Sequence, residues 1–181
     1  MNGRTIINIC STRYLFKQSP GSVDEVVKFF NLSEGTKNFL TAASPGQCII
    51  SLNNTVTAIG VYGLAGCTKL TSVVLPAVRR TEGNSMTGCS ALTKADFSNL
   101  QTIRYSTFYN NKNLIALIIR RHAVTTLDNT TNVFKNTPIE SGTGYIYVPS
   151  DMVSNYKAAT NWSTYANQIR AIEDYPDITG V

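Results

Sequence analysis

The sequence predicts an α/β fold in which a leucine-rich solenoid of about three to four 22-residue coils stacks short strands on one another. Apolar residues recur with a fixed period of 22 residues, which is typical of repeat architectures. Hydrophobic residues make up 43% of the chain and charged residues 15%, which indicates a folded core. Abundant Thr, Asn and Ser favour turns and short strands. We expect the solenoid over residues 56–140, an N-terminal helical and β-hairpin cap over 1–55, and a C-terminal strand-helix cap over 141–181.

The first fifty-five residues have helical patterns. The segment Ser22-Val23-Asp24-Glu25 has the form of a capping box, and it predicts a helix through about Phe30 with Val23, Val26, Val27 and Phe30 on one face. A second helix is expected to begin at Ser33-Glu34, with Phe39 and Leu40 packing inward. Ser44-Pro45-Gly46 then predicts a turn into a strand from Cys48 to Leu52, and Asn53-Asn54 predicts a tight turn.

Seven sets of positions carry the repeat. Successive side chains of a strand alternate between faces, so a position that recurs once per coil lies above its counterpart in the preceding coil. Each set therefore predicts one column of the core, and the first three sets reproduce the L-x-x-L-x-L pattern of leucine-rich repeats. The sets are Leu70, Leu92 and Leu114; Val73, Ala95 and Leu117; Leu75, Phe97 and Ile119; Val56, Val78 and Leu100; Ile59, Thr81 and Ile103; Leu64, Met86 and Phe108; and Cys67, Cys89 and Asn111.

The end of the repeat is less regular. A fourth, looser turn is expected through Val124, Leu127 and Phe134, with insertions at residues 122–123 and 128–132. Downstream, residues 145–148 predict a strand that ends at Pro149. Ser150 or Asp151 is expected to cap a helix through about Ala159. Trp162 and Tyr165 then begin a second short helix whose apolar side is expected to cover the open end of the core.

Two cysteines occupy one repeat column. Cys67 and Cys89 lie at the corner where this repeat class places Asn or Cys, and adjacent coils bring them close enough for either a disulfide or two buried free thiols. Asn111 at the third position favours free thiols, because it fills the same corner without sulfur.

Two parts of the chain resemble known families. Leu64 to Pro76 (LAGCTKLTSVVLP), the next coil (MTGCSALTKADF) and the closing GYIYVPSDMVSNYKAATNWSTYANQIRAIED resemble the BspA-like leucine-rich-repeat family of bacterial surface and phage-associated proteins, over about residues 56–181. This resemblance implies adhesion or recognition at a cell surface. Residues 5–59 resemble the C-terminal tail of the motor ATPases of conjugative type IV secretion. The phosphate-binding G-x-x-x-x-G-K-[ST] loop is missing from the sequence, so nucleotide hydrolysis is not expected.

Several classes of function find no support in the sequence. The net charge of +5 is dispersed apart from the doublets Arg79-Arg80 and Arg120-Arg121, so a nucleic-acid partner is not expected. The sequence has neither a membrane-spanning apolar segment nor a convincing signal peptide, and location is left undetermined. His122 is the single histidine and reads as an exposed turn residue. Neither a catalytic motif nor a metal or cofactor site is expected.

The candidate binding surface is the outward side of the stacked strands, since it forms a regular, rigid array. The candidate residues are Ser72, Val74, Lys94, Asp96, Ala116 and Ile118, against the alternative that they form ordinary sheet surface. Tyr105, Tyr109 and the Arg120-Arg121 doublet are secondary candidates.

The sequence therefore predicts a non-catalytic module for protein or cell-surface recognition, whose ligand it does not specify. The alternative is a truncated accessory, or fusion remnant, of a conjugative-transfer ATPase on a mobile element.

Overall fold

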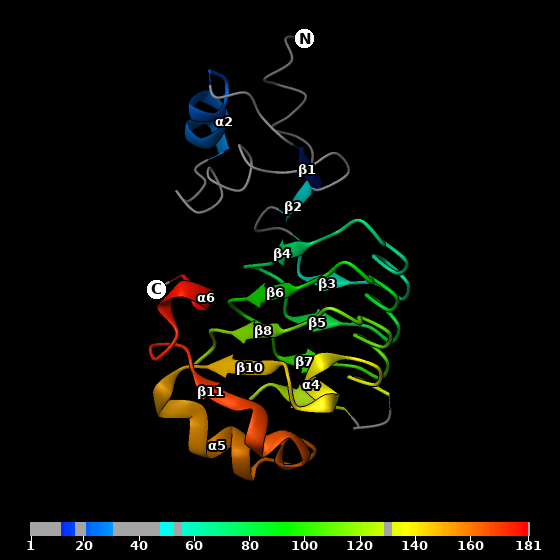
Figure 1. Ribbon diagram of the computed structural model, residues 1–181, viewed down its shortest axis with the longest axis vertical. Helices are drawn as coiled ribbons and strands as arrows, with labels where there is room; N and C mark the ends of the chain where they lie inside the picture. Colours follow the sequence, from blue (N-terminus) through cyan, green and yellow to red (C-terminus); the bar gives the residue numbers. More distant parts are fainter. Residues whose placement is uncertain (1–11, 17–20, 31–47, 53–55, 129–131, 181) are drawn as a thin grey trace.

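The computed structural model describes residues 12–16, 21–30, 48–52, 56–128 and 132–180. Within these ranges the strands form a seven-stranded sheet, in the order β1-β2-β4-β6-β8-β10-β11, and a four-stranded sheet, in the order β3-β5-β7-β9. Figure 1 shows the two sheets as the two sides of a stack of repeats, with each repeat contributing one strand to each sheet. The arrangement is an α/β repeat fold with parallel strands.

The bounds of the strands follow the repeat. The larger sheet contains β1 (Thr12–Phe16), β2 (Cys48–Leu52), β4 (Ser72–Val74), β6 (Lys94–Phe97), β8 (Ala116–Ile119), β10 (Tyr145–Val148) and β11 (Ile169–Ala171). The smaller sheet contains β3 (Ala58–Ile59), β5 (Arg80–Thr81), β7 (Thr102–Ile103) and β9 (Thr126–Leu127).

The strand register confirms the expected spacing. Val73 pairs with Ala95 and Ala95 with Leu117, each 22 residues apart, and the side chains of all three are fully buried. In the smaller sheet Thr81 pairs with Ile103, and Ile103 pairs with Leu127 after a longer step that accommodates part of the expected insertions. Leu70, Leu92 and Leu114 are likewise buried and belong to one hydrophobic core. The sequence period therefore sets the positions of the core residues.

The cysteine column contains free thiols. Cys67 is half-buried and Cys89 is fully buried. The Cys89 thiol donates a hydrogen bond to the carbonyl oxygen of Leu64 at 3.0 Å, and its backbone N–H donates to Asn111 Oδ1 at 2.9 Å. Burial raises the pKa of Cys89 to about 11, because a thiolate would lose its hydration there. Three successive coils are thus joined by hydrogen bonds at this corner.

The last repeat is covered by the segment that follows it. The rings of Phe108 and Phe134 stack with centroids 5.7 Å apart, continuing the column of Leu64 and Met86. Trp162 and Tyr165 pack on Phe134, with ring centroids at 6.4 Å and 5.0 Å. Both side chains are buried, which confirms that they cover the end of the core.

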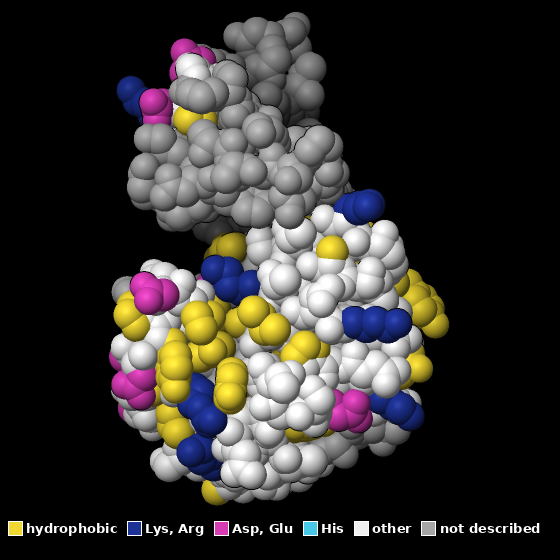
Figure 2. Space-filling view, in the orientation of Figure 1, with side chains coloured by type: hydrophobic (Ala, Val, Ile, Leu, Met, Phe, Trp, Pro, Cys, Tyr) yellow, Lys and Arg dark blue, Asp and Glu magenta, His cyan; other side chains and the backbone are white. Residues whose placement is uncertain are grey.

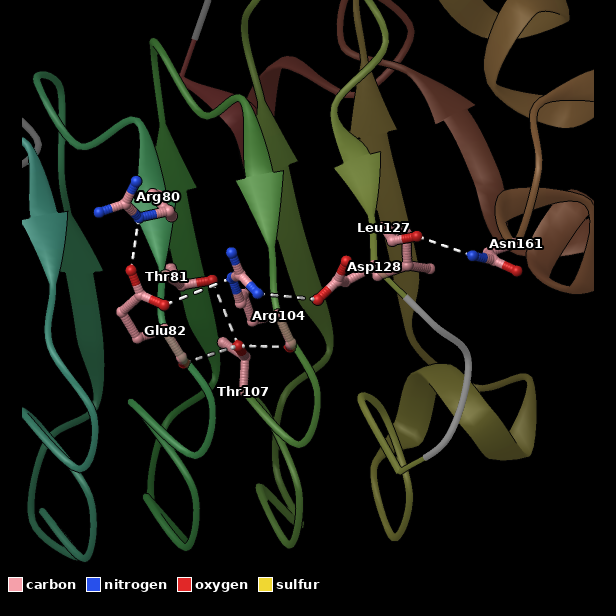
Figure 3. Close-up of polar contacts among 8 residues, drawn as sticks. All are labelled: Arg80, Thr81, Glu82, Arg104, Thr107, Leu127, Asp128 and Asn161. Atoms are coloured by element: carbon pink, nitrogen blue, oxygen red, sulfur yellow. Dashed lines mark hydrogen bonds and ion pairs between the residues drawn. The ribbon is translucent and has the colours of Figure 1, made fainter.

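Side chains from this covering segment also bond the backbone of the last repeat, next to and within β9. Trp162 Nε1 donates to the Thr125 carbonyl at 2.6 Å, and the Tyr156 hydroxyl accepts the Thr125 N–H at 2.9 Å. Asn161 Nδ2 donates to the Leu127 carbonyl at 2.8 Å (Figure 3). These three bonds occupy backbone groups that a further strand would otherwise pair with.

The helices match some expectations and correct others. The expected helices are α2 (Val23–Phe30), α5 (Val153–Ala158) after the 3₁₀ turn η1 (Ser150–Met152), and the 3₁₀ helix η2 (Trp162–Gln168). The short helices α4 (Pro138–Ser141) and α6 (Pro176–Thr179) were not predicted, nor were β1 and β11. The expected second N-terminal helix and the turns at residues 44–46 and 53–54 lie outside the described residues.

The expected cap at Ser150 or Asp151 is wrong. Neither side chain bonds a helix N–H: the Asp151 carboxylate faces His122 Nδ1 at 3.0 Å, and the Ser150 N–H donates to Glu173 Oε2 at 3.0 Å. A carboxylate from a distant part of the chain therefore replaces the local cap. The structure also extends the larger sheet across residues 55 and 140, where domain boundaries were expected, because β2 and β10 pair directly with repeat strands.

Candidate functional site

The six candidate residues lie together on the outer face of the larger sheet, in two rows that cross β4, β6 and β8. Ser72, Lys94 and Ala116 are paired in one row, and Val74, Asp96 and Ile118 in the other. The rows continue onto β10, because Tyr145 pairs with Ala116 and Tyr147 with Ile118. We call this surface, from Ser72 and Val74 to Tyr145 and Tyr147, the outer face.

Exposure along the outer face is uneven. The side chain of Val74 is 43% exposed, and Ser72 and Lys94 are half-buried. By contrast, Asp96 is buried, and Ala116 and Ile118 are 1% and 0% exposed. The expectation that Ala116 and Ile118 present themselves to a ligand is therefore corrected: in this structure only the half of the face toward β4 is open.

The covered half is closed by the end of the chain. Ile172, which follows β11, packs with Ala116, Ile118 and Tyr147 in a small apolar cluster separate from the main core. We call residues 172–180 the C-terminal segment. Figure 1 shows α6, within this segment, beside β6. Figure 2 shows hydrophobic side chains gathered between this segment and the strands, with Lys and Arg side chains nearby.

A charged cluster lies at the border between the open and covered halves. The Arg120 guanidinium binds the Asp96 carboxylate through two hydrogen bonds, Nε to Oδ1 at 2.9 Å and Nη2 to Oδ2 at 2.7 Å. Arg120 Nη2 also donates to the backbone carbonyl of Thr179. Lys94 Nζ donates to the carbonyl of Ile178 at 3.4 Å. Two cations of the outer face thus hold the main chain of the C-terminal segment, in the geometry of charge-assisted bonds.

Aromatic side chains complete the covered half. Tyr147 meets the rings of Tyr145 and Tyr175 edge-on, with centroids 6.4 Å and 5.4 Å away. Arg170 lies over the Tyr145 ring at 4.7 Å, a cation–π contact. Burial, and then the neighbouring tyrosines, raise the pKa of Tyr147, so its phenol stays protonated near neutral pH.

Sequence reasoning missed Tyr145, Tyr147 and Tyr175 as residues of the face and placed Arg120 on a loop. A usable signal existed for the first two, because the alternation of the strand at residues 145–148 gives Tyr145 and Tyr147 the same side. Among the secondary candidates, Tyr105 is 45% exposed and covers Gly83, while Tyr109 is half-buried. Arg121 donates to the Val124 carbonyl at 3.4 Å and does not reach the rows.

The smaller sheet has a different surface. Figure 3 shows a line of ion pairs across the coils, in which Arg80 and Arg104 both face Glu82, and Arg104 also faces Asp128. The Arg104 contacts are 3.4 Å long and substantially exposed, so solvent and salt screen them. Charges of alternating sign neutralise one another here, which leaves little net charge for a ligand.

The residues weighed for chemistry show no built reaction site. His122 has a side chain 71% exposed and contacts the Asp151 carboxylate, as expected of an exposed turn residue. In the described part of the chain, no group of three His, Cys, Asp or Glu side chains is placed to hold a metal ion. Across the same ranges, each helix is too short or too polar to cross a bilayer.

Comparison with known proteins gives one family. The family model described as a BspA type leucine-rich repeat region matches residues 47–159, in six copies. No curated protein matches the chain.

Proposed function

Because the chain belongs to the BspA-type leucine-rich-repeat family, we propose that it is a non-catalytic solenoid that recognises a protein partner through its outer face. Leucine-rich repeats form a repeat module suited to protein binding, and repeats of this family are generally non-enzymatic. The location at a cell surface and the role in adhesion, which the resemblance implies, stay predictions.

The observation that carries the proposal is the open half of the outer face. Val74 presents an apolar side chain at 43% exposure, flanked by the half-buried Ser72 and Lys94 on the same two rows. An exposed apolar side chain beside a cation is a combination typical of protein-binding surfaces, where apolar burial supplies affinity and charge supplies selectivity.

The scaffold beneath this surface is rigid. Val73, Ala95 and Leu117 lie directly behind the rows and are 0% exposed, so the face rests on a close-packed core. A rigid face loses little conformational entropy when a partner binds. The same residues support neither a nucleotide site nor a nucleic-acid site, since their cations are few and Arg120 is already paired with Asp96.

The transfer-system alternative rests on residues 5–59, of which the family match includes only those from 47 onward. No feature of the described residues favours it, and it stays a prediction from the sequence.

The test uses a displayed library of random peptides, selected for binding to the full chain. Each selected peptide is then measured against the Val74→Arg variant and against Thr126→Arg, which changes an exposed residue on the smaller sheet. We expect Val74→Arg to weaken binding at least about tenfold, since it places a charge in the apolar contact, and Thr126→Arg to leave it unchanged. Equal binding to all three proteins would contradict the assignment of the outer face.

A further inference from the structure

The C-terminal segment is attached to the outer face at only two buried points. Ile172 is 4% exposed and Thr179 is 2% exposed, whereas the six residues between them, 173–178, are all exposed. Tyr175 and Ile178 retain 37% and 36% exposure although they lie beside the face. An element that formed part of the core would bury more of its apolar side chains, so this attachment is shallow.

The face holds this segment mainly by its backbone. Lys94 and Arg120 donate to the carbonyls of Ile178 and Thr179, the last two residues of α6. Carbonyls at the end of a helix lack intrahelical partners and carry partial negative charge, which favours cations. Gly180 ends the helix with a φ of 73°, in the left-handed region. This contact would accept another chain that ends a helical turn in the same way.

Charge also matches between the two surfaces. Residues 173–180 carry three carboxylates, Glu173, Asp174 and Asp177, and contain neither Lys nor Arg. The side of the face that they approach carries Lys94, Arg120 and Arg170. Opposite charge steers association and selects among partners of similar shape.

From these observations, and resting on the function proposed above, we infer that the C-terminal segment is an internal ligand of the outer face. The partner that displaces it is an acidic polypeptide segment with a short helical turn, whose terminal carbonyls meet Lys94 and Arg120. A helix of four residues is unstable by itself, so α6 forms only while the face holds it. Release of Ile172 and Thr179 therefore opens Ala116 and Ile118 to the partner.

The experiment supplies the segment as a separate molecule. A fluorescent peptide of residues 171–181 is titrated with the full wild-type chain and with the full chain carrying Ile172→Ser and Thr179→Lys, substitutions that detach its own segment. We expect the released variant to bind the peptide at least about tenfold more tightly, because an occupied face reduces apparent affinity by the fraction that is free. Adding Lys94→Glu to the released variant should remove most of this gain, whereas adding Thr126→Arg should not.

Circular dichroism on each variant separates unfolding from loss of a contact. Hydrogen exchange on the wild-type chain gives a second measurement that needs no substitution. A library peptide that binds the face should raise exchange of the amides of residues 178–180, whose N–H groups bond within the segment.

Three results would overturn the inference. Equal peptide affinity for the folded wild type and the folded released variant would show that the segment does not compete. Unchanged exchange on binding would show the same. A wild-type dimer in light scattering, converted to monomer by the two releasing substitutions, would assign the segment to the face of a second copy. If library peptides bind both proteins equally and Val74→Arg still weakens them, this inference fails while the proposed function stands. If no peptide depends on the face in either protein, the proposed function fails.

Discussion

Replacement of Trp162 tests whether the segment after the repeats closes the core. The indole is 0% exposed, meets the rings of Phe134 and Tyr156 at 6.4 Å and 5.2 Å, and donates to the Thr125 carbonyl at 2.6 Å. Trp162→Ala removes the ring and leaves a cavity against the last coil, which costs about 3 to 5 kcal/mol of unfolding free energy. This is a large share of the stability of a typical domain, which is about 5 to 15 kcal/mol.

A second substitution at the same position separates packing from hydrogen bonding. Trp162→Phe keeps an aromatic ring against Phe134 and Tyr156 and removes the donor, so the Thr125 carbonyl loses its Trp162 partner in a buried setting. A buried polar group left without its partner costs about 1 to 3 kcal/mol. We therefore expect the order wild type, Trp162→Phe, Trp162→Ala in falling stability, with the Phe variant closer to the wild type.

The assay is urea unfolding followed by far-ultraviolet circular dichroism, because Trp162 is the only tryptophan and its fluorescence is lost in both variants. Tyr175→Ala, which changes an aromatic residue that is 37% exposed, serves as the control and should shift the midpoint much less. A Trp162→Ala free energy within about 0.5 kcal/mol of the wild type, at an unchanged m-value, would refute the reasoning that this side chain closes the core.

Three further predictions follow from single positions. Thr81→Val should be nearly neutral or stabilising in thermal unfolding, since Thr81 is buried between Ile59 and Ile103 and the Thr107 hydroxyl that it bonds keeps other acceptors; a loss above about 2 kcal/mol would contradict it. Tyr62→Asn should raise stability by up to about 1 kcal/mol in the same assay, because Tyr62 is 63% exposed at a φ of 57° that Asn tolerates better, and a lowered melting temperature would count against it. The Cys89 pKa, raised by burial to about 11 from 9.0, means that only the unfolded thiol ionises between pH 9 and 11, so unfolding free energy falls as pH rises through that window. Titration of stability should therefore fall more steeply for the wild type than for Cys89→Ala, and parallel curves would exclude this contribution.

The repeat was readable from the sequence because its cause is local. A strand alternates its side chains, and one coil of fixed length places each inward residue above the last, so the spacing of Leu70, Leu92 and Leu114 is enough to mark one column. The same rule identified the rows of Ser72 and Val74, and extended by one strand it reaches Tyr145 and Tyr147.

The failed cap at Ser150 has the opposite character. Local propensity favours a side-chain cap there, but the Ser150 N–H bonds Glu173, 23 residues away. The short strands β1 and β11 were also missed, since their pairing with β2 and β10 joins segments that lack the repeat period.

The sequence by itself determined the core columns, the two sheets' inward positions and the candidate rows, because a period of 22 residues records which side chains stack. Only the tertiary structure decided which part of the outer face is open. The contacts that close it join Arg120 to Thr179 and Lys94 to Ile178, across 59 and 84 residues, and such single, non-repeating pairs leave no periodic signal in a sequence.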